Sequence, residues 1–165
     1  MMRRWIGGAL LCGVLTANGI TAQQIQFGDR TTESKKPHVM LLTDMAEVTA
    51  GSPQDLELRF RVEPGYHINS HAPKDELLLP TVLTLEPVAE LKVSGPEYPA
   101  GHPFRLTIGD GETLDVYQDE FRVRVRLLAQ RGSHTLHGAL RYQACDNAAC
   151  YPPRTLPVKV LVTAK

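Results

Sequence analysis

Apolar and charged residues alternate strictly in two stretches of this sequence, 56–62 (LELRFRV) and 121–127 (FRVRVRL). Alternation of this kind puts the apolar side chains on one face of an extended strand and the charged ones on the other. In 136–142 and 156–162 the apolar residues also share one parity. We therefore predict four half-buried strands at these positions, and no stretch carries a convincing helical apolar stripe.

Turn-forming residues break the chain between and around these strands. They are Gly51-Ser52-Pro53, Pro64-Gly65, Gly95-Pro96, Gly109-Asp110-Gly111 and Arg131-Gly132. About seven or eight short strands separated in this way are typical of an immunoglobulin-like fold. We expect an all-β, antiparallel, immunoglobulin-like β-sandwich, with a barrel as the alternative because periodicity does not separate the two. The Gly- and Pro-rich stretch 98–117 is expected to be a long loop, and long loops in compact domains often carry function.

The first 22 residues have the layout of a secretory signal peptide. Arg3 and Arg4 precede an apolar run that is too short to span a bilayer, and a small-residue cleavage site ends at Ala22. The alternative is a buried N-terminal helix. We expect export and cleavage, then a flexible polar leader over 23–36 and one domain over 37–165.

The charge of the exported chain excludes one class of partner. Cleavage removes two arginines and no acidic residue, so 16 basic residues face 18 acidic ones. The row Arg122, Arg124 and Arg126 is interpreted as one exposed sheet face rather than an anion site. We therefore expect no nucleic-acid partner. No later apolar run is long enough for a membrane span. We also expect the protein to be a monomer.

Cys145 and Cys150 are the two cysteines that remain after cleavage. An even number of cysteines in an exported protein is compatible with a disulfide. Tyr142 belongs to one predicted strand and Leu156 begins the next, so the cysteines lie at the two ends of a hairpin-like connection. Four residues between them let the chain double back, so that the sulfurs can reach bonding geometry.

Two roles are open for this pair. As a structural link, it closes a loop of about six residues and contributes only about 2 kcal/mol, although short-range disulfides are common in secreted proteins. As a redox pair, it lacks the C-x-x-C spacing and the following helix that lower a thiol pKa. A dithiol without such activation still exchanges electrons when its partner brings the reactive thiolate.

His67 and His71 raise the possibility of a metal site. Two histidines without a third ligand are a weak signal, because the cysteines supply thiolates only when they are reduced. We expect no metal and no cofactor. The favoured interpretation is that Tyr66, His67 and Asn69 form a strand end that lies near the cysteines.

The sequence YQACDNAACYPP around the cysteines resembles the active-site hairpin of the N-terminal periplasmic domain of the thiol:disulfide interchange protein DsbD. Three further segments occur in the same order as in that family: PGYHINSHAPKDELLLPTVLTL, YPAGHPF and LDVYQDEFRVRV. The resemblance extends over about residues 37 to 163. It implies an immunoglobulin-like sandwich that carries a redox-active cysteine pair in the periplasm.

The resemblance also implies roles for single residues. Cys150 matches the cysteine that forms mixed disulfides with partners, and Cys145 matches the one that resolves them. A cap loop shields the pair in that family, and the matching stretch is about 101–116, where Phe104 or Leu106 is the expected shielding residue. The residues expected to line the site are Tyr66, His67, Tyr142, Tyr151 and Pro152.

The function implied by the resemblance is thiol:disulfide exchange by a protein-disulfide reductase. In full-length family members, a membrane domain and a thioredoxin-like domain deliver electrons, and the N-terminal domain reduces disulfide isomerases and proteins of cytochrome c maturation. We therefore expect thioredoxin-like proteins as reductant and acceptor. The alternative is a non-catalytic secreted β-sandwich binding module with a structural disulfide.

This sequence departs from the family pattern in three respects. Its cysteine spacing is one residue shorter than in the best-known enterobacterial members. Its cap stretch lacks their acidic-aromatic motif. The sequence ends at Lys165 without a membrane or thioredoxin-like domain, so we expect a separate polypeptide as the reductant.

Overall fold

The computed structural model describes residues 37–106 and 111–165. Within these ranges the regular structure is entirely β. The strands are β1 (Val39–Leu41), β2 (Met45–Val48), β3 (Gln54–Val62), β4 (His67–Asn69), β5 (Val82–Leu85), β6 (Leu91–Glu97), β7 (His102–Arg105), β8 (Thr113–Tyr117), β9 (Glu120–Ala129), β10 (Gly132–Tyr142), β11 (Ala144–Cys145) and β12 (Arg154–Ala164). The predicted signal peptide and leader lie outside the described residues. No helix in the described ranges could cross a membrane.

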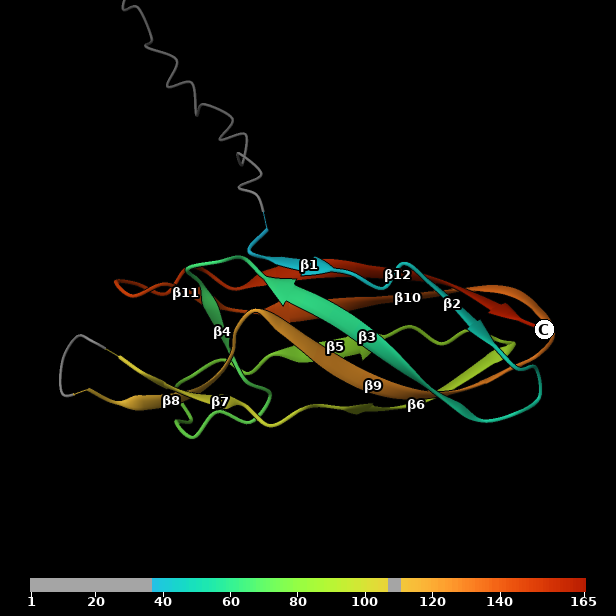
Figure 1. Ribbon diagram of the computed structural model, residues 1–165, viewed down its shortest axis with the longest axis horizontal. Helices are drawn as coiled ribbons and strands as arrows, with labels where there is room; N and C mark the ends of the chain where they lie inside the picture. Colours follow the sequence, from blue (N-terminus) through green and yellow to red (C-terminus); the bar gives the residue numbers. More distant parts are fainter. Residues whose placement is uncertain (1–36, 107–110) are drawn as a thin grey trace, which may run out of the picture. The chain divides into compact units, whose positions relative to one another are not determined.

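Two four-stranded sheets form the predicted sandwich (Figure 1). One has the order β1-β3-β9-β6 and the other the order β2-β12-β10-β5. The all-β, immunoglobulin-like expectation is therefore confirmed. The structure differs from the antiparallel prediction in one strand pair. β2 pairs with β12 in parallel, while the other strand pairs of the two sheets are antiparallel.

The alternating residues form the core as predicted. In β3 and β9 every second side chain is buried, and the register places Leu58 opposite Val123 and Phe60 opposite Phe121. Leu136 and Val160, which pair between β10 and β12, belong to the same core. Burial of this apolar face is the main force that holds the two sheets together.

The charged faces of β3 and β9 are exposed, as the sequence indicated. Cross-strand ion pairs connect Arg122 to Glu57 at 3.4 Å and Arg126 to Asp55 at 3.8 Å, and Arg124 approaches Glu97 of β6 at 3.7 Å. Exposed pairs of this kind contribute little to stability. They neutralise the arginine row and support its interpretation as a solvated face.

The stretch expected as a long loop is more ordered than predicted. β7 and β8 pair antiparallel, from His102 opposite Val116 to Arg105 opposite Thr113, and form a cap hairpin (102–117) whose residues 107–110 are not described. This hairpin continues into a third sheet with the order β11-β4-β8-β7. The strand end expected at Tyr66, His67 and Asn69 is present as β4. The sequence did not indicate β7 and β11 as strands, because two to four residues are too few to establish a period.

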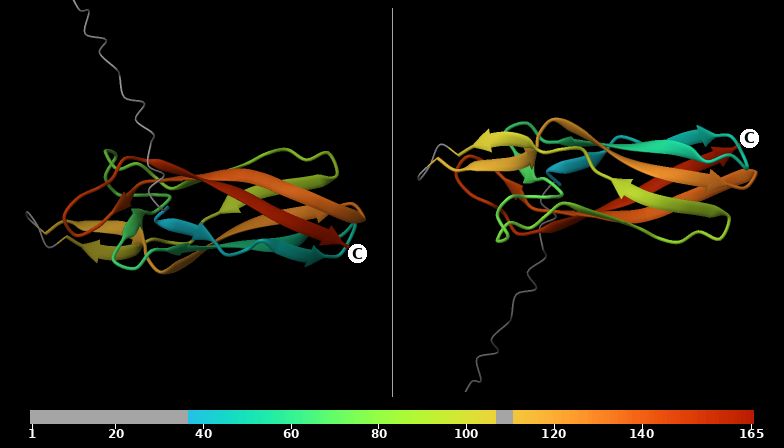
Figure 2. Two further views of the ribbon diagram at one scale, coloured as in Figure 1. Left: turned by 90° about the horizontal axis from the view of Figure 1, so that it is seen from above. Right: turned by 90° about the horizontal axis from the view of Figure 1, so that it is seen from below.

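Stacked aromatic rings connect the third sheet to the core. Phe121 stacks on Phe60 with ring centroids 5.2 Å apart and on Tyr117 of β8 at 4.6 Å. The Tyr117 hydroxyl donates to the Pro99 carbonyl oxygen and accepts from the His71 amide. Figure 2 shows from two sides that the cap hairpin and the β10–β12 connection lie at the same end of the sandwich, away from Lys165.

Replacing Phe121 by Ala should lower the free energy of unfolding by about 3–5 kcal/mol, because the change leaves a cavity between Phe60 and Tyr117. Chemical denaturation followed by circular dichroism measures this loss. Leu161→Ala is the control, since Leu161 is 45% exposed and its truncation should change stability by less than about 0.5 kcal/mol. Equal losses for both variants would contradict the assignment of Phe121 to the core.

Candidate functional site

The two cysteines form a disulfide at the end of the sandwich. Their sulfur atoms are 2.04 Å apart and their Cα atoms 4.0 Å apart, and the residues face each other across an antiparallel bridge. Cys145, at the end of β11, is only 1% exposed, whereas Cys150 is exposed. An incoming group therefore meets Cys150 first. We call residues 142–154 the cysteine hairpin.

Asp146 organises the turn between the cysteines. Its Oδ1 accepts hydrogen bonds from the amides of Ala148 at 2.7 Å and Ala149 at 2.8 Å, and its Oδ2 accepts from the Tyr151 hydroxyl at 2.6 Å. The Tyr151 hydrogen bond, followed by the two amides, lowers the pKa of this carboxyl below its usual value. The same contact raises the pKa of Tyr151 to about 12. The sequence analysis did not identify this role of Asp146. An Asp whose carboxylate accepts a hydrogen bond from the backbone amide two residues later is nevertheless a recognisable turn signal.

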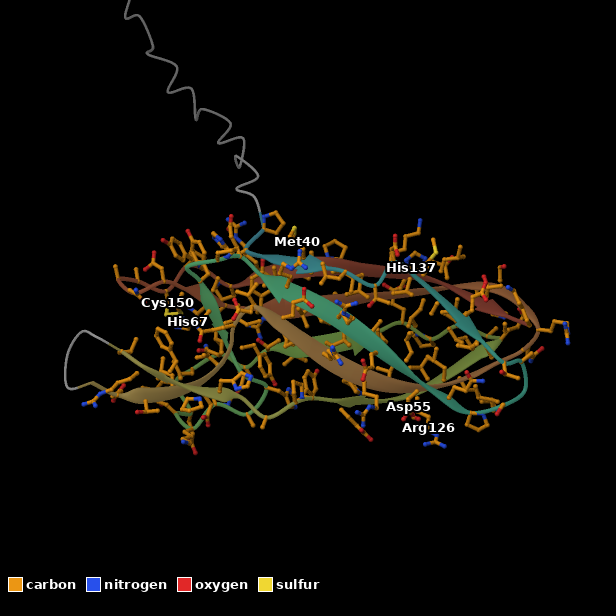
Figure 3. All side chains as sticks on the ribbon, viewed as in Figure 1. Met40, Asp55, His67, Arg126, His137 and Cys150 are labelled. Carbon is orange, nitrogen blue, oxygen red and sulfur yellow. A yellow bond between two sulfur atoms is a disulfide. The ribbon has the colours of Figure 1, made fainter. Side chains whose placement is uncertain are left out.

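His67 lies directly opposite Cys145 in the pairing of β4 with β11. Its side chain is buried, and the ring of Phe104 from the cap hairpin packs on it with centroids 4.3 Å apart. Burial lowers the pKa of His67 below 6.5, and the negative charge of Asp146 acts in the opposite direction. Figure 3 shows His67 and Cys150 at the same end of the sandwich.

A cluster of three rings, His38, Tyr66 and Tyr151, lies beside the cysteine hairpin. Tyr66 stacks on His38 with centroids 4.0 Å apart and meets Tyr151 at 5.8 Å. The His38 Nδ1 is 2.9 Å from a carboxylate oxygen of Glu63. These residues, together with Pro152, line a cavity of about 560 Å³. His38 was missed in the sequence because it precedes the first strand and belongs to no motif.

Three further residues were expected at the site, Tyr142, Leu106 and Phe104, and they differ in where they lie. Tyr142 is 1% exposed and lies in the hydrophobic core rather than on the surface of the site, and burial raises its pKa. Leu106, the last described residue before 107–110, is half-buried, and its amide donates to the Glu112 carbonyl oxygen. Of the two cap residues, Phe104 is the one with a ring contact next to a cysteine.

The two histidines of the metal alternative point to different neighbours. His71 stacks on Tyr98 with centroids 3.6 Å apart, and its Nδ1 lies 2.9 Å from the Thr81 carbonyl oxygen. His67 meets Phe104 instead. Within 37–106 and 111–165, no three His, Cys, Asp or Glu residues come together in a way that could hold a metal ion.

Replacing Tyr151 by Phe should raise the pKa of Asp146 towards its ordinary value, because the hydroxyl that stabilises the carboxylate is lost. Since the folded-state pKa of Asp146 is depressed, the lost stabilisation is present at neutral pH and shrinks as the pH falls through that pKa. Carbon-detected NMR titration of the carboxyl group measures the shift. Tyr98→Phe, remote from Asp146, should leave it unchanged, and an unshifted Asp146 in Tyr151→Phe would contradict the assignment.

Comparison with known proteins places the chain in a family. Residues 40–161 match the family model described as thiol:disulfide interchange protein DsbD, N-terminal. Similar solved structures include the Neisseria meningitidis DsbD N-terminal domain in the reduced form, with 22% identity, 67% of this chain and 78% of that chain covered, and a TM-score of 0.43. The N-terminal periplasmic domain of ScsB from Proteus mirabilis shares 16% identity over 73% of this chain and 44% of that chain, with a TM-score of 0.42.

A third similar structure is the complex between the DsbD N-terminal and PilB N-terminal domains of Neisseria meningitidis, with 20% identity, 67% and 77% coverage and a TM-score of 0.39. The search of curated proteins found no match. The family model covers most of the sequence, including both cysteines. The chain therefore belongs to the family of DsbD N-terminal domains, which are thiol:disulfide exchange domains.

Proposed function

We propose that this protein passes electrons between thioredoxin-like proteins through Cys145 and Cys150 in the periplasm. The observation that carries the proposal is the unequal exposure of the two cysteines, with Cys150 exposed and Cys145 buried. A thiolate from a reductant reaches Cys150 and displaces Cys145. A disulfide that only stabilises the fold does not require one of its cysteines to be exposed and the other buried.

The reaction is balanced in both directions. In reduction of the domain, a partner thiolate attacks the Cys150 sulfur, the Cys145–Cys150 bond breaks, and Cys145 leaves as a thiolate that takes up a proton. The partner's second thiolate then attacks the partner sulfur of the mixed disulfide and releases Cys150. In the reverse direction, the Cys150 thiolate attacks an acceptor disulfide and Cys145 resolves the mixed disulfide, so that two electrons pass to the acceptor.

The size of the closed loop also supports exchange over a purely structural role. A disulfide that closes a loop of about six residues stabilises a fold by only about 2 kcal/mol. The sandwich already has a core drawn from both large sheets. Most of the stability of the fold is therefore expected from this core rather than from the pair.

Phe104 is proposed as the side chain that shields the pair. Its ring covers His67, the cross-strand neighbour of Cys145, and its strand β7 is an edge strand of the third sheet. An edge strand is held by hydrogen bonds on one side alone, so displacement of the cap hairpin breaks fewer contacts than displacement of a central strand. The adjacent cavity beside Tyr151 and Pro152 offers a surface for the partner.

A trapping experiment tests the proposal. Reduced Cys145→Ser keeps the exposed thiol of Cys150 and loses the resolving one, so it should accumulate a mixed disulfide with an oxidised thioredoxin-like protein. Cys150→Ser should form little or none, because its remaining thiol is buried. Non-reducing electrophoresis and mass spectrometry measure the adducts. The proposal fails if neither variant is trapped and the native pair has a reduction potential below about −300 mV, the range of structural disulfides.

Replacing Phe104 by Ala should accelerate reduction of the native disulfide by dithiothreitol several-fold, because the shielding ring is removed. The free thiols released over time measure the rate. Leu106→Ala is the matched control on the same hairpin and should have a smaller effect. If Phe104→Ala is reduced no faster than the native protein, the cap hairpin does not limit access to the pair.

A further inference from the structure

We propose that the imidazole of His67 is the base that removes the proton from the Cys145 thiol when Cys145 resolves a mixed disulfide. This inference rests on the proposed function. The thiolate is the nucleophile in disulfide exchange, and burial in apolar surroundings keeps a thiol protonated. Cys145 is the buried member of the pair, so its step requires a nearby proton acceptor.

The strand register puts the two side chains on the same face. His67 of β4 and Cys145 of β11 are directly opposite each other, and so are the next residues, Ile68 and Ala144. Ile68 and Ala144 belong to the hydrophobic core. Because side chains alternate across a strand, His67 and Cys145 face away from that core, towards the cap. Directly opposed residues have Cβ atoms about 4.5–5.5 Å apart, which brings an imidazole and a thiol within reach of each other.

One ring nitrogen of His67 has no hydrogen-bond partner among the described residues. Its Nε2 is buried and accepts or donates no hydrogen bond within the described residues. A buried polar atom without a partner is costly, and such atoms in native structures often have a chemical role. In the oxidised state Cys145 has no proton to offer, because its sulfur is bonded to Cys150. Reduction creates a thiol in the position that can donate to this nitrogen.

The surroundings of the ring suit a base. Phe104 of β7 covers it and restricts water, while Cys145 and Asp146 approach from the cysteine hairpin. Burial lowers the pKa of His67, so the ring is neutral and able to accept a proton near pH 7. The Asp146 carboxylate opposes this shift and stabilises the imidazolium once it forms. Hydrogen bonds from Tyr151 and two amides keep Asp146 ionised.

In the mixed disulfide, Cys150 is bonded to a partner sulfur, and Cys145 is a thiol. Its proton moves to His67, its sulfur attacks Cys150, the bond from Cys150 to the partner breaks, and the partner leaves as a thiolate. The Cys145–Cys150 disulfide forms, the partner sulfur is reduced, and His67 returns its proton to the departing thiolate or to water.

Two-phase reaction of the reduced protein with 5,5′-dithiobis(2-nitrobenzoate) tests the assignment. In the first phase Cys150 attacks the reagent, forms a mixed disulfide with one thionitrobenzoate and releases the other as a coloured thiolate. In the second phase Cys145 attacks Cys150 and releases the bound thionitrobenzoate as a second coloured thiolate. We expect the second-phase rate of the native protein to be nearly constant around neutral pH and to fall as His67 becomes protonated at lower pH. In His67→Gln this rate should be about 100-fold lower at pH 7.

The pH dependence separates a base from a residue that only positions Cys145. At alkaline pH the thiol ionises without help, so the rates of His67→Gln and the native protein should converge. A rate deficit of equal size at every pH would overturn the proposal. His137→Gln, an exposed histidine remote from the cysteines in Figure 3, is the control and should match the native profile.

A second variant covers the case in which His67→Gln does not fold. Asp146→Asn keeps an oxygen that accepts from Ala148 and Ala149 but removes the negative charge. It should lower the pKa of His67 further and move the acid limb of the second-phase profile to lower pH. An unmoved limb would overturn the assignment. If the native protein shows no second phase at all, the proposed exchange function itself fails, which is a different outcome.

Discussion

Strand β4 is the element on which the arrangement of the site depends. It has three residues, and it pairs with β11 on one side and β8 on the other. Through these pairings one short strand sets the position of Cys145, of His67 and of the cap hairpin that carries Phe104. Backbone hydrogen bonds of a sheet leave little freedom in register, because a shift by one residue turns every side chain to the other face. Such a shift would move His67 into the core and Ile68 towards the cap.

The cysteine hairpin combines a rigid turn with unequal burial. Asp146 holds the turn through the amides of Ala148 and Ala149, and Tyr151 closes it from the far side. Cys150 is in contact with solvent while Cys145 is buried. Under the proposed function, this asymmetry directs a partner to Cys150 and keeps Cys145 for the second step. On the loop-closure model, a disulfide that closes so short a loop stabilises the sandwich by only about 2 kcal/mol.

His67 and Asp146 are two titratable groups close enough to influence each other near the cap hairpin. His67 is buried without a hydrogen bond at Nε2, and its pKa is lowered by that burial. Asp146 is nearby and ionised, yet most of its hydrogen-bonding capacity is used by the turn. A neutral ring beside a fixed negative charge can gain a proton at lower cost than an isolated buried ring. These features suit the role proposed for His67, because burial favours the neutral ring and Asp146 favours its protonated form.

The sequence alone determined the half-buried strands, because strict alternation in 56–62 and 121–127 allows one face of each strand to be buried and the other to be solvated. The structure decided between a sandwich and a barrel, because that choice depends on which strands pair. The sequence also determined the family and the cysteine pair, through residues that lie close together along the chain. Only the tertiary structure decided that His67 faces Cys145, that Phe104 covers it, that Tyr142 lies in the core, and that Asp146 is held by Tyr151. The first two depend on pairing between strands far apart in sequence, and the burial of Tyr142 on packing against other elements. β7 and β11 are too short for a periodic pattern to reveal.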